Sequence, residues 1–171
     1  VEAIESLGHT NYMVEIGGEV FAKGTNPTDG PWRIGIETPS AHAPGIFEVV
    51  TLSGQALATS GDYRNFYEDK GQRFSHTIDP RTGRPIKHKL ASVSVLSQSC
   101  AQADAMATAL NVLGPIDGPK LAQEKGIAPA IVTSSLRRRF LRTALAARQI
   151  AAPVLSFEEV GTEARPALVG T

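Results

Sequence analysis

Short segments in which apolar and polar residues alternate dominate the first half of this chain, and two-residue turns separate them. Residues 11–22 alternate on both sides of Gly17-Gly18, and residues 47–52 and 55–59 do so around a Ser-Gly pair. Alternation with a period of two is typical of strands with one buried face, and glycine-containing two-residue turns join antiparallel neighbours. The pattern therefore predicts two antiparallel hairpins.

The rest of the chain contains further strands and helices. We expect strands at 32–37, 74–78, 90–96 and 128–133, and helices at the N-terminus to residue 7, at 101–113 and at 119–125. Residues 90–96 alternate cleanly, which favours a central strand. Gly114-Pro115 is expected to end the helix at 101–113. Hairpins followed by helices indicate an α+β fold, with helices packed on one face of a mostly antiparallel sheet.

Charge and cysteine content exclude several classes of protein. The chain has 171 residues, and its 17 Lys and Arg balance its 17 Asp and Glu, so we expect no nucleic-acid partner. No run of about 18 apolar residues occurs, so no membrane-spanning helix is expected. Cys100 is the only cysteine, which excludes an internal disulfide and a thiolate zinc site.

The C-terminal region differs in composition from the rest of the chain. Residues 136–150 contain five arginines and no acid, with leucines at helical spacing, which predicts a basic amphipathic helix. Such a helix can lie on a membrane surface or bind RNA, although a solvated helix face is the simpler interpretation. Residues 151–171 are punctuated by proline and glycine, so a loosely ordered tail is expected.

Asp104 and Thr108 form the first candidate site. They stand four residues apart in a predicted helix, so their oxygen atoms share one helix face. Magnesium prefers oxygen ligands and completes its octahedron with water and substrate phosphate, so this pair is a candidate metal site. The alternative is that each side chain only makes a local hydrogen bond with the backbone near the helix start.

The stretch S-H-T-I-D-P-R-T-G-R-P at 75–85 forms the second candidate site. Two prolines and a glycine constrain its backbone, and Asp79 is expected to cap the turn by accepting backbone hydrogen bonds. His76 can move a proton at neutral pH and is the candidate general base, although a histidine beside a strand often has only a structural role. Arg81 and Arg84 could bind phosphate oxygens or simply lie on the solvated surface.

Residues 59–62, with the sequence T-S-G-D, are expected to end a strand in a turn. Such a turn can present backbone N–H groups to an anion, which makes Ser60 and Gly61 candidate contacts to a phosphorylated cofactor. Ordinary turn chemistry is the alternative. The stretch at 75–85 and the pair of Asp104 and Thr108 together suggest a polyphosphate and divalent-metal site, with a nearby histidine able to move a proton.

Four blocks of sequence occur in order along the chain. They are N-Y-M-V-E-I-G-G-E-V at 11–20, T-S-G-D-Y-R-N-F-Y at 59–67, S-H-T-I-D-P-R-T-G-R-P-I at 75–86 and A-D-A-M-A-T-A-L-N-V-L-G at 103–114. In this order they resemble the flavin transferases of the ApbE family. The third block is highly specific, and the resemblance covers residues 1–133, which are expected to be the C-terminal part of an ApbE-like domain.

The resemblance implies a reaction and a set of residue roles. Members of the family move FMN from FAD onto a Thr or Ser hydroxyl of a target flavoprotein and release AMP, with Mg²⁺ as cofactor. Asp104 and Thr108 match the metal ligands, His76 matches the histidine that deprotonates the acceptor hydroxyl, and Ile78 matches a position that contacts FAD. The implied partners are therefore FAD and an acceptor flavoprotein.

The chain also departs from the family. Relatives have an N-terminal half that supplies much of the flavin pocket and completes the metal site, so we expect this chain to start within a longer protein or to be processed. Ala107 stands where some relatives carry a second aspartate, and residues 134–171 form a divergent basic segment. An FAD pyrophosphatase and a flavin-binding module without chemistry are therefore retained as alternatives.

Family resemblance also bears on location. Members of this family are commonly exported, often as lipoproteins. The resemblance therefore implies a periplasmic or inner-membrane-anchored protein, with membrane association through an upstream lipid anchor.

Overall fold

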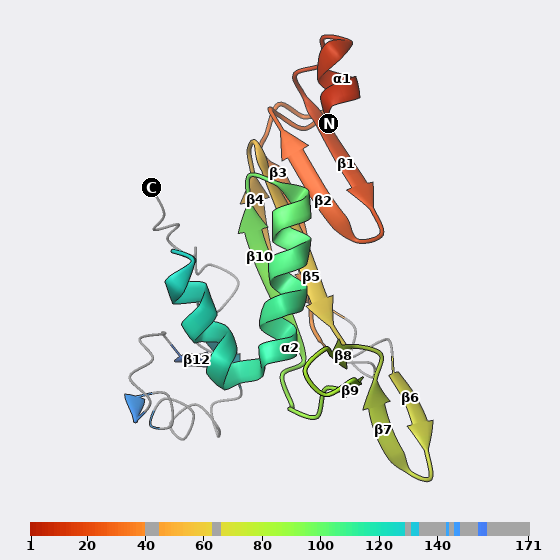
Figure 1. Ribbon diagram of the computed structural model, residues 1–171. Coiled ribbons are helices and arrows are strands. Elements are labelled where there is room, and N and C mark those ends of the chain that lie inside the picture. The colour runs from red at the N-terminus through yellow and green to blue at the C-terminus, as the bar shows by residue number, and fades with distance from the viewer. Residues whose placement is uncertain are drawn as a thin grey trace. The chain divides into compact units, whose positions relative to one another are not determined.

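The computed structural model describes residues 1–39, 45–62 and 66–128, together with residues 131–133, 143, 146–147 and 154–156. They belong to two compact units, Val1–Val112 and Leu113–Thr171, which are described one at a time. Figure 1 shows the elements in chain order, beginning with the short helix α1 (Glu2–Ser6), which confirms the helix expected at the N-terminus.

A four-stranded antiparallel sheet organises the first unit. Its order is β1-β2-β5-β10, where β1 is Tyr12–Ile16, β2 is Glu19–Lys23, β5 is Gln55–Gly61 and β10 is Ser92–Ser97. The hairpin predicted around Gly17-Gly18 is confirmed as β1 and β2, and both glycines have the positive φ that such a tight turn needs. β10 confirms the strand expected at 90–96, but within the described residues it lies at the sheet edge, since β5 pairs with both β2 and β10.

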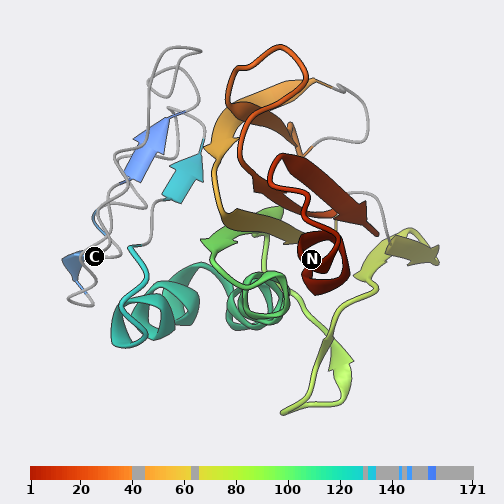
Figure 2. The same ribbon diagram turned by 90° about the horizontal axis from the view of Figure 1, so that it is seen from above.

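A second layer contains β3 (Trp32–Glu37) and β4 (Ile46–Leu52), which pair with each other and lie over one face of the sheet (Figure 2). The hairpin predicted between residues 47–52 and 55–59 was wrong. Both strands exist, but β2 and β10 already occupy the two edges of β5. The chain therefore passes from one layer to the other at Ser53-Gly54, and β4 and β5 are not paired as a hairpin.

An apolar core fills the space between these two layers. Its buried members are Val20, Ala22, Val50, Leu52 and Leu57, and Trp32, Ile34, Ile36 and Leu96 pack against them. Val20 and Leu57 are paired across β2 and β5, and Leu52 has no exposed surface. Removal of apolar surface from water is the main stabilising term in folding, so this core holds β3 and β4 on the sheet.

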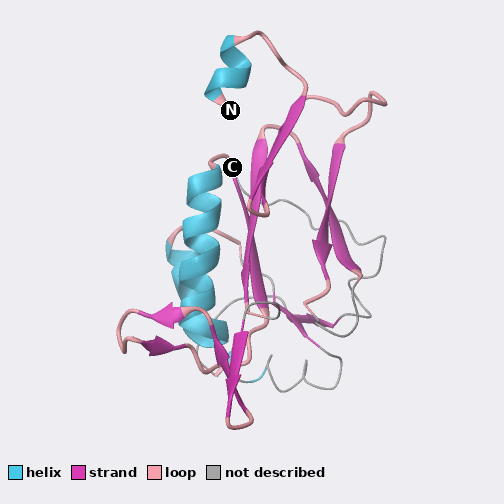
Figure 3. Ribbon diagram, turned by 90° about the vertical axis from the view of Figure 1, so that its right-hand side faces the viewer, coloured by secondary structure: helices cyan, strands magenta, loops and turns pink. Residues whose placement is uncertain are grey.

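Helix α2 (Cys100–Glu124) covers the opposite face of the sheet with its first part, as Figures 1 and 3 show. Ala103 and Ala107 on the helix have no exposed surface, and neither do Ala56 and Ala58 on β5. Because alanine side chains are short, the helix and this strand can lie close together. The expected packing of a helix on one face of a mostly antiparallel sheet is thus confirmed.

The helix is broken at Gly114, as the sequence predicts, but it does not end there. Gly114 has φ 75° and ψ −172°, a backbone conformation that glycine adopts readily. Helical structure resumes directly afterwards and not at residue 119, because Pro115 falls in the first turn, where its missing N–H is not needed. The second helical segment therefore starts earlier than expected.

Two small hairpins connect β5 to β10. In one, β6 (Phe66–Asp69) pairs with β7 (Gln72–Ser75), and in the other, β8 (Ile78–Asp79) pairs with β9 (Arg84–Pro85). The single strand predicted at 74–78 was wrong, because His76 and Thr77 separate β7 from β8. The Thr77 N–H donates to the buried Ser75 Oγ at 3.1 Å, and this local hydrogen bond turns the chain out of β7.

In the second unit, β11 (Ile131–Thr133) pairs in parallel with β12 (Val154–Ser156). The strand predicted at 128–133 is confirmed for its last three residues, and β12 interrupts the loosely ordered tail expected at 151–171. The basic helix predicted at 136–150 lies mostly outside the described residues, apart from a helical hydrogen bond of 3.0 Å from the Ala147 N–H to the Thr143 carbonyl. Among the described helices, none combines the length and apolarity that crossing a bilayer would require.

Candidate active site

The predicted metal ligands Asp104 and Thr108 lie one turn apart on α2 and are both exposed. Ala103 and Ala107, which precede each of them, point into the interface with the sheet, so the neighbouring face of the helix remains open. Neither Asp104 nor Thr108 makes a side-chain hydrogen bond or ion pair with another described residue. The local hydrogen bond considered as the alternative role is therefore not observed in this part of the chain.

The chemistry of this pair suits a hard divalent cation. A carboxylate and a hydroxyl supply two oxygen ligands on one helix face, and the remaining positions stay open to water and phosphate. Within the described residues, no group of three or more His, Cys, Asp or Glu side chains could hold a metal. Any metal at Asp104 and Thr108 therefore depends on ligands from a bound substrate, from the backbone or from another part of the protein.

Two carboxylates act electrostatically on Cys100, the first residue of α2. Burial raises the pKa of the Cys100 thiol, and the negative charges of Glu19 on β2 and of Asp104 raise it further. These effects place the carboxylates of Glu19 and Asp104 within electrostatic reach of the same thiol.

Ser60 and Gly61 are part of strand β5 and do not form the turn that the sequence predicted. They are paired with Val93 and Ser92 of β10, and the next N–H, that of Asp62, donates to the Ala91 carbonyl at 3.3 Å. The Asp62 N–H is thus used inside the sheet. What this segment offers to an anion is the half-buried Ser60 side chain.

Asn111 is the residue of this region that sequence reasoning missed. Its side chain is fully buried on α2, and its Nδ2 donates to Ser60 Oγ at 3.4 Å, which links the helix to β5. Its Oδ1 is buried and has no hydrogen-bond partner among the described residues. The available signal was an asparagine within the apolar run A-L-N-V-L at 109–113, seven residues after Asp104.

His76 and Ile78 lie in the connection between β7 and β8. His76 is exposed, and 48% of the Ile78 surface is accessible. The chain around them is anchored, because Ser75 before His76 is buried and the carbonyl of Thr77, between the two residues, accepts the Ile86 N–H at 3.0 Å. His76 therefore lies on an anchored segment between β7 and β8, and Figure 1 shows these two strands beyond the end of β5.

Asp79 caps the turn between β8 and β9, as predicted. One of its carboxylate oxygens accepts the Arg81 N–H at 2.9 Å, and its backbone carbonyl accepts the Gly83 N–H at 2.8 Å. The Arg81 guanidinium binds the same carboxylate, and these hydrogen bonds lower the pKa of Asp79. Arg81 thus interacts with Asp79, whereas Arg84 is exposed, as expected for a surface arginine.

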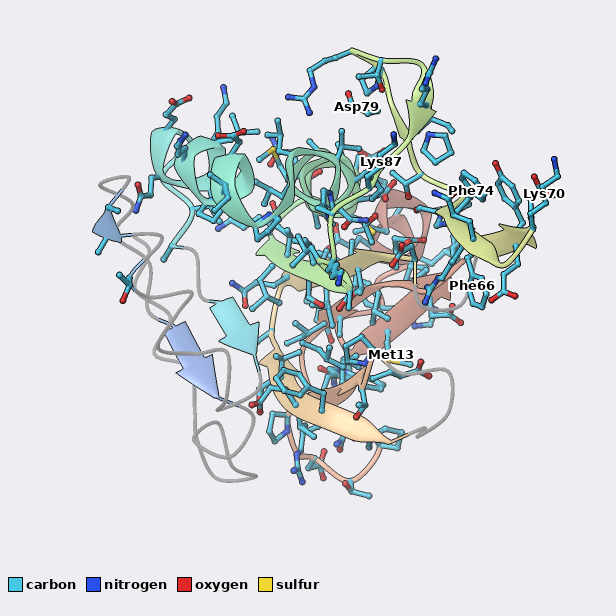
Figure 4. The ribbon with its side chains drawn as sticks, turned by 90° about the horizontal axis from the view of Figure 1, so that it is seen from below. Met13, Phe66, Lys70, Phe74, Asp79 and Lys87 are labelled. Carbon is cyan, nitrogen blue, oxygen red and sulfur yellow. The ribbon has the colours of Figure 1, made fainter. Side chains whose placement is uncertain are left out.

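The hairpin of β6 and β7, which ends directly before His76 in the chain, carries an aromatic surface. Tyr67 and Phe74 stack with ring centroids 5.0 Å apart, and the Arg73 guanidinium lies 3.9 Å from the centroid of the Phe66 ring. Figure 4 shows Phe66 and Phe74 on this hairpin with Lys70 at its tip. The cation–π contact and the stacked pair stiffen an exposed hairpin that has little burial to stabilise it.

A comparison with protein families identifies the family to which this chain belongs. Residues 1–143 match the model of the ApbE family. The chain belongs to the ApbE family. It is 46% identical over 132 residues to a FAD:protein FMN transferase of Vibrio cholerae, and 44% identical over 132 residues to one of Haemophilus influenzae; each match covers 77% of this chain.

Solved structures give the same result for the ApbE fold. This chain is similar to the flavinyl transferase ApbE of Pseudomonas stutzeri in its apo form, with a TM-score of 0.62, 46% identity, and coverage of 74% of this chain and 39% of that one. It is similar to the flavin transferase ApbE of Vibrio cholerae with a TM-score of 0.63, 47% identity, and coverage of 72% and 38%. The chain spans about two fifths of the curated relatives, covering 40% and 38% of the two named above.

Proposed function

We propose that this chain carries the metal-binding and acceptor-activating part of an enzyme that transfers FMN from FAD to a Thr or Ser hydroxyl of a flavoprotein. The observation that carries the proposal is the open Asp104 and Thr108 pair, presented on one face of α2 in a chain of the ApbE family. Relatives of known name are FAD:protein FMN transferases. Magnesium dependence, AMP release and the acceptor hydroxyl are parts of the proposal.

Asp104 and Thr108 would hold the magnesium ion through their side-chain oxygens. When bound, the ion supplies electrostatic stabilisation of negative charge on the diphosphate and on the AMP leaving group. Ser60, Gly61 and Ile78 would contact FAD, with Ser60 offering its hydroxyl and Ile78 an apolar surface. The small side chains of α2 and β5 would keep these two elements close enough to bind one substrate.

His76 would act as the general base. It takes the proton from the acceptor hydroxyl, whose oxygen then attacks the phosphorus on the FMN side of the diphosphate. A new phosphorus–oxygen bond joins FMN to the acceptor as the bond to the AMP phosphate breaks, and AMP leaves. An exposed histidine on an anchored segment suits this role, because a protein substrate must be able to reach it.

The test is release of AMP from FAD by the full-length protein with Mg²⁺, with and without an acceptor flavoprotein. AMP that appears only with acceptor, together with flavin bound covalently to the acceptor, would support the transferase. AMP and free FMN without acceptor would indicate an FAD pyrophosphatase, with water in place of the hydroxyl. Binding of FAD without AMP in either tube would indicate a flavin-binding module and contradict the proposal.

We also propose a periplasmic or inner-membrane-anchored location, which rests on family resemblance. The acceptor flavoprotein would then be met at or outside the inner membrane. Cell fractionation with an antibody against the protein tests this, and recovery in the cytoplasmic fraction alone would contradict it.

A further inference from the structure

We propose that Asn111 is a positioning residue for the flavin substrate, because it orients the Ser60 hydroxyl to donate a hydrogen bond to a phosphate oxygen of FAD. The inference rests on the proposed function and deepens it. Asn111 is fully buried where α2 meets the sheet, beside the buried residues Ala107 and Leu110. Burial of an amide in such an apolar interface is unfavourable unless its polar atoms are used, so its presence requires a reason.

The hydrogen bond between Asn111 and Ser60 has a defined direction. Asn111 Nδ2 donates to Ser60 Oγ at 3.4 Å. A serine hydroxyl has one proton to donate and two lone pairs that accept. Since Asn111 uses a lone pair, the Ser60 proton points elsewhere, and no other described residue forms a hydrogen bond with Ser60 Oγ. Ser60 is only half-buried, so this proton is available to a ligand.

The position of Ser60 relative to the metal ligands follows from the helix. Thr108 and Asn111 are three residues apart, which makes them neighbours on the helix surface. Asp104 and Asn111 are seven residues apart, so they lie within about 20° of the same helix face. The Ser60 hydroxyl, held by Asn111, therefore extends the row of oxygen groups that Asp104 and Thr108 begin.

An elongated anion fits this row better than a single phosphate. Asp104 and Thr108 at one end suit a cation bound to phosphate, and a hydroxyl donor one turn further along suits a second phosphate oxygen. The diphosphate of a dinucleotide has this arrangement of charge. Asn111 itself stays buried and reaches the substrate only through Ser60.

The experiment compares Asn111→Leu, Ser60→Ala and the double variant in the full-length protein. Leucine has the same branching as asparagine, with two methyl groups in place of the amide oxygen and nitrogen, so it removes the amide without leaving a cavity. The dissociation constant of FAD is measured with Mg²⁺ from flavin fluorescence, and the thermal midpoint is measured on the same samples. Each single variant should bind FAD about tenfold more weakly, and the double variant no more weakly than either one.

The thermal midpoint separates positioning from a structural role. Asn111→Leu should keep or raise it, because the substitution removes a buried oxygen that has no partner among the described residues. Asn111→Asp should also weaken FAD binding, since a carboxylate would accept the Ser60 proton. Two results would overturn the inference. One is a loss of FAD affinity in the double variant that equals the sum of the two single losses, and the other is weaker FAD binding in Asn111→Leu accompanied by a lower thermal midpoint.

Two outcomes distinguish this inference from the proposed function. If wild-type protein transfers FMN and Asn111→Leu binds FAD as tightly as wild type, the positioning role is wrong and the function stands. If wild-type protein neither binds FAD nor releases AMP, the proposed function is wrong and this inference falls with it.

Discussion

The carboxylate of Asp79 accepts three hydrogen bonds from Arg81, two from its guanidinium and one from its backbone N–H, each of 2.9 Å. Asp79 thus both caps the turn and forms the ion pair that holds the β8 and β9 hairpin. The segment that carries His76 and Ile78 enters this hairpin directly. The shape of the hairpin therefore depends on the charge of Asp79.

Replacement of Asp79 should loosen this hairpin in a way that depends on pH. The Arg81 hydrogen bonds lower the pKa of Asp79, so its stabilising effect is fully present above about pH 4, the ordinary value for aspartate, and is lost as pH falls through the lowered pKa. Asp79→Asn keeps an oxygen for the cap but loses the charge. Amide hydrogen exchange at Gly83 should be faster in Asp79→Asn than in wild type at pH 6, and the difference should vanish near pH 2. Equal protection at pH 6 would contradict this role.

Asp104→Asn should greatly reduce the proposed magnesium-dependent reaction. The substitution keeps the size of the side chain and removes the anionic ligand, so we expect AMP release at fixed Mg²⁺ to fall by about 100-fold and partial rescue at higher Mg²⁺. Asp117→Asn is a matched control, because Asp117 is an exposed acid on the same helix that pairs with Lys120 at 2.8 Å. Wild-type magnesium dependence in Asp104→Asn would remove the metal assignment.

His76→Gln should lower the rate of flavin transfer without preventing FAD binding. Loss of a general base typically reduces a rate by about 10²- to 10⁴-fold, whereas glutamine keeps hydrogen-bonding capacity at the same place. His9→Gln provides the control, since His9 is exposed and outside the site. A variant that transfers flavin at the wild-type rate would show that His76 is not the base.

Leu52→Ala should destabilise the first unit strongly. Leu52 is fully buried in the core between the sheet and the pair of β3 and β4, and its truncation leaves a cavity there. Large-to-small changes of this kind cost about 2–5 kcal/mol in the free energy of unfolding. Chemical denaturation can compare it with Leu7→Ala, whose side chain is 76% exposed and whose loss should change stability little. Similar free energies of unfolding for both variants would contradict the two-layer core.

Several elements could be predicted from the sequence because local interactions determine them. The Gly17-Gly18 hairpin, the cap by Asp79 and the helix break at Gly114 each depend on backbone conformations that a few neighbouring residues favour. The spacing of Asp104 and Thr108 is likewise a property of the helix itself. For these features the structure confirms what local sequence predicts.

Strand pairing could not be predicted in the same way. The segments on both sides of Ser53-Gly54 were correctly predicted as strands, but the turn between them was interpreted as a hairpin. Which strands occupy the edges of β5 depends on β2 and β10, which are distant in sequence. Local alternation indicates that a strand forms but not where its partner lies.

The sequence by itself determined the family, the α+β class and the residue types of the candidate site, since motifs and periodicities are carried by neighbouring residues. Only the tertiary structure decided that Ser60 belongs to a strand, that Asn111 reaches it across the interface, and that the side chains of Asp104 and Thr108 are exposed. Those facts depend on how closely small side chains on α2 and β5 allow the helix and sheet to approach. Packing between segments that are distant in sequence sets the separation of helix and sheet, and local sequence patterns do not predict it.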